Sequence, residues 1–355
     1  MKKIKFICAM LPLFLLQGCF DSRDVKDVAI VMGMGVEAGK NETYNTITQV
    51  VLPGGLSKDG GGDTFENYSG EGEHIGECIE KATLSCEKYM YLSHATALVI
   101  DEKIAKNGIY EILDYFMRDN ELRSNLAIAV SGNINKVMNT ESKLLKVPLS
   151  DVASLKRRFR ETSLGISPTV FDFVSDMLKK DCATIVPIIS ENGVSGSAVF
   201  KNGKMIEKIS NTEARGILWL LNKMENAIIT VSLEDATFDI KIKSASAKIK
   251  PVYENEIIKA EIKCKASLLR DDKGVLNAFG AKRAEEQISA QIKSEILAAF
   301  DKMQSIDADV YGFSDMVYKK DAKNWSENIF QKIKLDIAVD SEIDEVGNIL
   351  RSAGR

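Results

Sequence analysis

The sequence predicts a protein of mixed α/β or α+β class with several domains, in which mixed sheets pack against helices. In the first half of its 355 residues, apolar runs of strand length alternate with segments of helical periodicity. The second half carries strands in which polar and apolar residues alternate, then one long amphipathic helix near the C-terminus. The composition, 45% hydrophobic and 28% charged, is typical of a folded globular chain. Its length exceeds what one core usually supports, so two or three domains are expected.

Residues 1–18 have the plan of a secretory signal peptide. Three lysines precede an apolar run over residues 6–16 that contains Pro12. The run is too short for a membrane-spanning helix, which needs about 20 apolar residues. It ends in Leu16-Gln17-Gly18-Cys19, directly before the charged segment 21–24.

Leu16, Gln17, Gly18 and Cys19 resemble the lipobox of bacterial lipoproteins. The resemblance implies that a signal peptidase cuts before Cys19 after its thiol has received a diacylglycerol, and that an N-acyl chain such as palmitate follows. A thiolate is a much better nucleophile than a serine hydroxyl, which explains the need for cysteine. Two acyl chains are enough for stable anchoring. An ordinary cleaved signal with an incidental cysteine is the alternative.

The folded part is expected to begin with a strand, a turn and a second strand. Val28 to Met32 is a compact apolar run, and Tyr44 to Leu52 is rich in threonine and other residues that favour strands. Gly33-Met34-Gly35 invites a dinucleotide-binding interpretation, but that motif needs a helix directly after the glycines. Residues 39–42 indicate a turn instead.

Periodicity then predicts an alternation of helices and strands up to residue 189. Helices are expected over 72–88, 104–118, 151–161 and 169–178, and strands over 97–100, 126–130 and 184–189.

The residue pattern of the sequence changes around Glu191, and we place a domain boundary there. The predicted domains are an α/β domain over 19–191 and an α+β domain over 192–355, and the second could divide into two smaller lobes. Asn202-Gly203 predicts a tight hairpin between strands over 196–200 and 205–209. Ser210 and Glu213 form a capping box that starts a helix. Alternating strands follow from residue 228 and over 258–268, then a helix over 283–303 and a last strand over 333–339.

No constellation of catalytic residues or metal ligands is evident in the sequence, so a non-enzymatic protein without metal or cofactor is expected, apart from the lipid on Cys19. The two histidines, His74 and His94, lack partners at zinc-ligand spacing. A net charge of -4 argues against nucleic acid as a partner. Buried free thiols are the favoured interpretation of the remaining cysteines, Cys78, Cys86, Cys182 and Cys264.

Two stretches are candidate interaction surfaces. The basic patch runs from Lys156 to Arg160 and is either a solvated helix face or a contact for anionic lipid or an acidic partner. The aromatic cluster comprises Tyr311, Phe313 and Trp325, for which core packing is an equal alternative.

Several segments follow one another in a characteristic order along nearly the whole chain. They are the opening at 18–36, His94 with 98–100, 108–113 and 118–119, the hairpin and helix at 196–221, and the segments 309–313 and 325–347. Together they resemble the Ger(x)C family, the C-subunit lipoproteins of GerA-type spore germinant receptors. Phe20 stands where tryptophan is usual in that family, and Ser314 replaces a second glycine.

The resemblance implies a multi-domain α/β fold and a non-enzymatic lipoprotein on the outer face of the spore inner membrane of a sporulating bacterium. Its partners would be the bilayer and two integral membrane proteins, an A subunit and a transporter-like B subunit. A solute-binding lipoprotein of a membrane transporter is the alternative function, and a cell-envelope enzyme is the third.

If Cys19 carries the lipid, the Cys19→Ser precursor should stay uncut and take up no labelled fatty acid, because a hydroxyl replaces the acceptor thiolate. Gel mobility and fatty-acid labelling measure both effects, and normal processing of this variant would contradict the lipobox interpretation.

Overall fold

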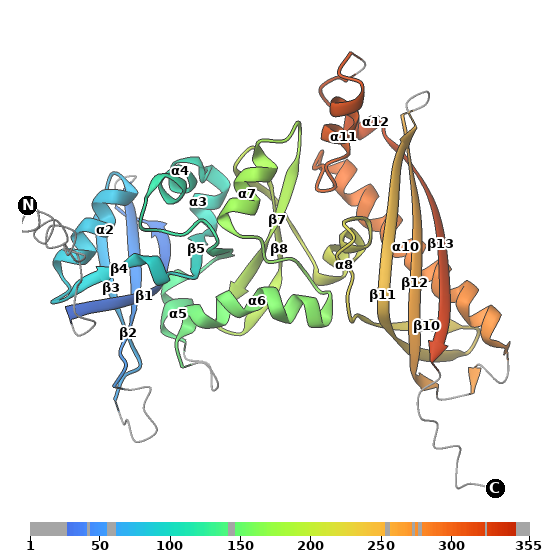
Figure 1. The fold of residues 1–355 in the computed structure, drawn as a ribbon, viewed down its shortest axis with the longest axis horizontal. Helices are drawn as coiled ribbons and strands as arrows, with labels where there is room; N and C mark the ends of the chain where they lie inside the picture. The colour runs from blue at the N-terminus through green and yellow to red at the C-terminus, as the bar shows by residue number, and fades with distance from the viewer. Residues whose placement is uncertain are drawn as a thin grey trace, which may run out of the picture.

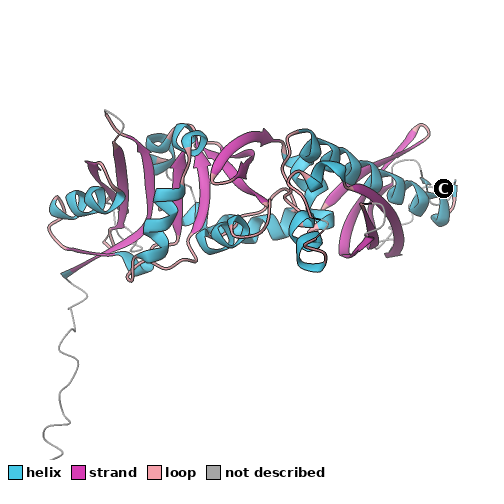
Figure 2. Ribbon diagram, turned by 90° about the horizontal axis from the view of Figure 1, so that it is seen from above, coloured by secondary structure: helices cyan, strands magenta, loops and turns pink. Residues whose placement is uncertain are grey.

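A computed structural model describes residues 27–40, 43–54, 62–140, 146–252, 256–271, 274–275, 279–323 and 325–345. It is an elongated molecule with a sheet at each end (Figure 1). The first half forms a large sheet with helices against it, and the second half forms a smaller sheet with a long helix along it (Figure 2). The predicted mixed class, with mixed sheets and a long helix near the C-terminus, is confirmed.

The first sheet has nine strands, in the order β3-β2-β1-β5-β6-β7-β8-β9, with β4 paired to β1. Its centre, β1, β5, β6 and β7, is parallel, and antiparallel strands extend it on both sides. The central strands are almost fully buried, as parallel strands covered on both faces usually are. The bounds are β1 Val28–Ala38, β2 Tyr44–Val51, β3 Phe65–Gly72, β4 Tyr89–Tyr91, β5 Ala97–Asp101, β6 Ala127–Ser131, β7 Ala183–Ser190, β8 Gly193–Lys201 and β9 Lys204–Ile209.

Helices cover both faces of this sheet and enclose separate cores. On one face, α2 (Ile75–Leu84), α3 (Glu102–Asn107), α4 (Tyr110–Arg118) and α7 (Val170–Met177) enclose a core with the sheet. On the other face, α5 (Ile134–Asn139) and α6 (Pro148–Thr162) do the same.

The predicted strand-turn-strand start is confirmed, and β1 runs straight through the two glycines. A Cβ at Gly33 would lie 2.4 Å from the Ala97 carbonyl oxygen, and one at Gly35 would lie 2.6 Å from Cγ2 of Ile134. These glycines therefore allow β5 and α5 to pack directly against β1.

The prediction of one helix over 104–118 is wrong, because the chain breaks into α3 and α4 at Gly108. Gly108 has a φ of 130°, which side-chain-bearing residues rarely adopt. The backbone N–H of Ile109 then donates to the Gly203 carbonyl in the turn between β8 and β9, at 3.0 Å. Apolar periodicity runs across the break because both helices bury residues in the same core.

The second sheet has four strands, in the order β10-β11-β12-β13, with β12 and β13 parallel and the other pairs antiparallel. The long helix α10 (Ala281–Ser305) lies along one face, and its predicted stripe from Ile288 to Met303 is buried. The strands are β10 Ile228–Leu233, β11 Ala236–Val252, β12 Ile257–Asp271 and β13 Lys334–Glu345, and the short helices α11 Phe313–Lys320 and α12 Ile329–Lys332 lie between α10 and β13.

The hairpin and capping box predicted after residue 191 are confirmed. Asn202 and Gly203 both have positive φ, as a tight hairpin turn requires. Ser210 and Glu213 cap α8 (Asn211–Leu220) reciprocally, with Glu213 N–H to Ser210 Oγ at 3.2 Å and Ser210 N–H to Glu213 Oε2 at 2.7 Å. Because β8 and β9 extend the first sheet, that sheet continues past the predicted boundary, and the division of the chain stays a prediction.

Helix α8 joins the two halves by packing closely on α10. A Cβ at Gly216 would lie 2.6 Å from both the Ala299 Cβ and the Glu295 carbonyl oxygen. Beside this contact, Arg215 Nε donates to Glu295 Oε2 at 3.1 Å, and the Glu295 side chain is only 7% exposed. One continuous core includes residues of β7, β8, α8, α10 and the second sheet.

Gly216→Ala should lower the free energy of unfolding by about 2 kcal/mol, because the added methyl group forces α8 away from the α10 backbone. Chemical denaturation followed by circular dichroism measures this loss.

Gly132→Ala is the matched control. A Cβ there meets only Glu102 Oε2 at 3.7 Å, so the substitution should change stability little. Equal effects of the two substitutions would contradict a close helix contact at Gly216.

Candidate functional site

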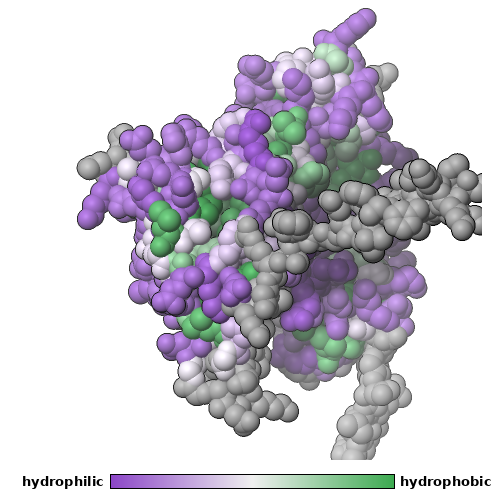
Figure 3. Space-filling view, turned by 60° about the vertical axis from the view of Figure 1, so that its left-hand side comes forward, coloured by the Kyte–Doolittle hydropathy of each residue, from purple (hydrophilic) through white to green (hydrophobic). Residues whose placement is uncertain are grey.

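The predicted lipobox residues Leu16, Gln17, Gly18 and Cys19 lie outside the described residues, so lipid attachment stays a prediction. Within the described ranges, none of the helices combines the length and the apolar character needed to cross a membrane. On the face in Figure 3, apolar side chains form small separate patches in a mainly hydrophilic surface.

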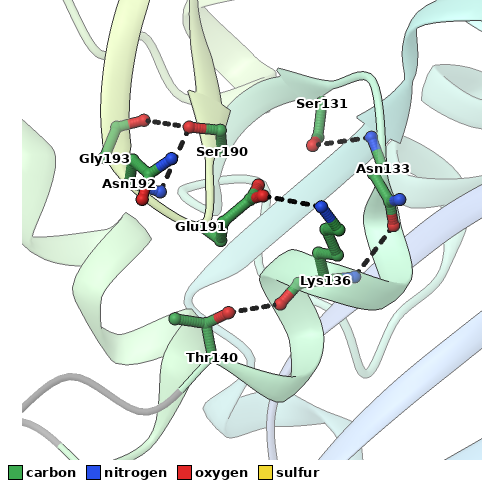
Figure 4. Close-up of polar contacts among 8 residues, drawn as sticks. All are labelled: Ser131, Asn133, Lys136, Thr140, Ser190, Glu191, Asn192 and Gly193. Carbon is green, nitrogen blue, oxygen red and sulfur yellow. Dashed lines mark hydrogen bonds and ion pairs between the residues drawn. The ribbon is translucent and has the colours of Figure 1, made fainter.

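The C-terminal ends of β6 and β7 carry a polar cluster at a place where α/β proteins often bind ligands (Figure 4). Ser131 Oγ accepts from the Asn133 N–H at 3.2 Å, and Asn133 Oδ1 accepts from the Lys136 N–H at 2.9 Å. Lys136 Nζ lies 2.8 Å from Glu191 Oε1, which lowers the pKa of Glu191 and raises that of Lys136. These groups satisfy one another, so the cluster fastens α5 to the turn after β7.

A cavity of about 600 Å³ lies between the two halves of the molecule. We call it the junction cleft. Its walls are α6, the loop 165–168, α7 and the start of β7 on one side, and the end of α8, residues 223–225 and the loop 310–312 on the other.

The lining of the junction cleft includes apolar side chains and two residues whose hydroxyl oxygens are buried. Ile166, Phe171 and Leu221 contribute half-buried or exposed apolar surface. Ser167 and Tyr311 also line the cleft, with exposed fractions of 5% and 9%. Neither hydroxyl has a hydrogen-bond partner among the described residues.

The rim of the junction cleft carries charges of both signs. Arg160 pairs with Glu225 at 3.4 Å, and Lys179 with Asp176 at 2.6 Å. In the described part of the chain, the other two cations, Lys156 and Lys223, form no ion pair. The ionised carboxylate of Asp172 interacts with the charges of both lysines, so the four cations and three carboxylates that line the cleft leave a net charge of +1.

The remaining carboxylate of the rim, Asp172, serves as part of a helix cap. Partial desolvation would raise the pKa of Asp172, but hydrogen bonds from Thr169, helped by the charges of Lys156 and Lys223, lower it. The Asp172 carboxylate accepts from both the N–H and the hydroxyl of Thr169, at 3.0 and 2.9 Å. It is therefore ionised and already engaged at the start of α7.

The ends of the two walls are bound together by Ser163, the residue after α6. Its backbone is left-handed, with a φ of 50°, and its hydroxyl donates to the Glu225 carbonyl and accepts from the Glu225 N–H at 2.8 Å. The position of Lys223 relative to α6 thus depends on a buried contact and not on the surface ion pair alone.

Asp309 fixes the loop that places Tyr311 at the cleft. Its fully buried carboxylate accepts from the Tyr311 N–H at 3.1 Å and from the Ser314 N–H at 2.6 Å. Its carbonyl accepts from the Ala183 N–H at 2.9 Å, which ties the loop to the start of β7. Burial raises the pKa of the Asp309 carboxyl to about 6, although the hydrogen bonds oppose the shift.

The structure brings parts of the two sequence-predicted surfaces together in this cleft. Lys156 and Arg160 of the basic patch and Tyr311 of the aromatic cluster all line it. Phe313 is instead fully buried and stacks on Tyr311, with 5.1 Å between ring centroids, which is core packing. Trp325 lies elsewhere, against Tyr318.

Sequence reasoning missed Ser167, Phe171 and Lys223 as cleft residues. Nothing in their spacing links them, because they come from a loop, a helix and the segment after another helix that meet only through the tertiary fold.

The four cysteines in the described part of the chain are free thiols. Cys78, Cys182 and Cys264 are buried free thiols, as predicted, and Cys86 is half-buried and also free. Burial raises the pKa of each of the three buried thiols. No group of three or more metal-ligating side chains occurs among the described residues.

Comparison with known proteins gives matches along most of the chain. Residues 21–191 match the family described as spore germination protein N-terminal domain, and residues 195–347 match spore germination B3/GerAC like, C-terminal. Spore germination protein KC of Bacillus subtilis (strain 168) is 26% identical over 90% of this chain and 88% of its own length. Spore germination protein B3 of the same organism is 22% identical over 84% of each chain.

A solved structure described as the crystal structure of the GerBC protein has the same fold. It superposes with a TM-score of 0.55 at 17% sequence identity, over 88% of this chain and 97% of its own.

Because of Asp309, the free energy of unfolding should fall as the pH rises. Because burial holds the pKa of its carboxyl at about 6 in the folded chain, above the ordinary aspartate value of 3.8, the folded state binds the proton more tightly than the unfolded state does. Relative to Asp309→Asn, the wild type should therefore lose up to about 3 kcal/mol of unfolding free energy as the pH rises from about 4 to about 6.5.

Denaturant unfolding of both proteins at several pH values measures the difference between them, in which the other titrating groups cancel. A difference that stays constant across this pH range would show that the pKa of Asp309 is not raised in the folded chain.

Proposed function

We propose, because the chain belongs to the Ger(x)C family of spore germination proteins, that it is the lipid-anchored, non-enzymatic subunit of a nutrient germinant receptor. The observation that carries the proposal is the match of both family domains, in order, along nearly the whole chain. The partners are an integral membrane A subunit and a transporter-like B subunit. The site of action is the outer face of the spore inner membrane.

Lipid attachment at Cys19 would place the first sheet close to the bilayer. Residues 20–26 separate Cys19 from Asp27, the first described residue, and even a fully extended chain of this length spans only roughly 30 Å. Confinement to one plane raises the local concentration of the anchored domains near membrane partners. The anchor therefore acts as a tether that makes weak contacts with the A and B subunits effective.

A role without catalysis is supported by the polar clusters of the described residues. The strand-end cluster around Lys136 and Glu191 pairs internally, and the buried thiols have raised pKa values. The Asp309 carboxylate is engaged by backbone N–H groups. Each of these groups serves the fold, which agrees with a scaffold or interaction subunit.

One observation favours the alternative function, a solute-binding lipoprotein of a membrane transporter. The junction cleft lies between two halves of the molecule, which is a common place for small-molecule sites. Genetic context separates the two functions, because a receptor subunit should be encoded beside two membrane proteins, one of transporter type.

Deletion of the protein should abolish the germination response to its nutrient in spores that lack related receptors. Spores with Cys19→Ser should respond weakly or not at all, because the folded domains are no longer held beside their partners. Loss of optical density after nutrient addition measures the response.

Cys86→Ser is the matched control, since Cys86 is a half-buried free thiol outside the signal and should be dispensable. The anchored-subunit proposal fails if Cys19→Ser spores contain only unlipidated protein yet germinate at the wild-type rate.

A further inference from the structure

We propose that the junction cleft binds a small organic anion, a molecule with one carboxylate on an apolar body. This ligand-binding activity goes beyond the anchored-subunit function and does not depend on it.

The first argument is charge. Lys156 from α6 and Lys223 from the segment after α8 stand on opposite walls of the cleft without an ion pair among the described residues. Glu225 pairs with Arg160 and Asp176 with Lys179, and the Asp172 carboxylate, held in its helix cap, offsets part of the charge of both lysines. The cleft lining keeps a net charge of +1, which one ligand carboxylate would neutralise.

The second argument is the apolar part of the lining. Ile166, Phe171 and Leu221 line the cleft and are half-buried or exposed, so they offer surface to an aliphatic or aromatic body. The hydroxyl oxygens of Ser167 and Tyr311 are themselves buried and do not take part in this contact.

The third argument is size and place. A volume of about 600 Å³ lies in the range of sites for small molecules and is too small for a two-chain phospholipid. Residues from both halves of the molecule form the walls, so a bound ligand contacts both and stabilises their arrangement. The occupant is therefore a free small acid and not a membrane lipid.

Isothermal titration calorimetry of the full chain in nanodiscs of neutral lipid tests the proposal, with empty nanodiscs as the blank. The probes are hexanoate and 4-phenylbutanoate, each compared with its uncharged primary amide. We expect saturable binding of at least one carboxylate with a Kd below about 1 mM, and binding at least about tenfold tighter than that of the matching amide.

Substitutions then assign the binding to the cleft. Lys156→Ala and Lys223→Ala should each weaken carboxylate binding by about three- to tenfold and leave amide binding unchanged. Phe171→Ala should weaken both, because Phe171 lines the cleft and its side chain, 54% exposed, can be shortened without loss of the fold. Arg157→Ala is the matched control, an exposed cation next to Lys156 that does not line the cleft.

Three results would overturn the proposal. The first is the absence of saturable heat with both carboxylates, and the second is equal affinity for acid and amide. The third is an Arg157→Ala effect as large as that of Lys156→Ala, which would indicate general surface charge. Thermal unfolding of each variant without ligand confirms that a loss of binding is not a loss of fold.

Discussion

The contact of α8 with α10 at Gly216 is the constraint on which the arrangement of the two halves depends. The absent side chain at Gly216 lets the helices approach until their backbones nearly touch. Glu295 then pairs with Arg215 in a partly buried place, where a charge-assisted hydrogen bond is stronger than in water but where loss of one partner would leave a buried charge. Since α8 follows β9 directly, this contact fixes the first sheet against the second.

The junction cleft follows from the same contact. The end of α8 contributes Leu218 to its lining, and Ser163 binds residue 225 to the end of α6. On the same side as the end of α8, Asp309 holds the Tyr311 loop at the start of β7 through backbone hydrogen bonds. The cleft is thus bounded by elements that are each fixed to a neighbour, and any shift between the halves would change its width.

The local elements could be read from the sequence where short-range chemistry decides the structure. Asn202-Gly203 specifies the hairpin turn, and Ser210 with Glu213 specifies the start of α8, because each depends on residues within one turn of chain. The break at Gly108 was missed because apolar periodicity outweighed a single glycine. The strand β3, with sequence FENYSGEG, has too little alternation to predict and owes its conformation to pairing with β2. The cleft could not be predicted, because its residues meet only when α8 packs on α10.

The proposed anchor at Cys19 and the junction cleft together determine how a bound ligand could act on neighbouring membrane proteins. The anchor, if present at Cys19, acts on the first sheet alone, because residues 20–26 lead directly into β1. The second sheet lies at the other end of the molecule and reaches the first through α8 and the loops around the cleft (Figure 1). A molecule bound between Lys156 and Lys223 would touch both halves. Its binding free energy would therefore favour one position of the far sheet relative to the anchored one, which is the form in which occupancy can be transmitted to neighbouring membrane proteins.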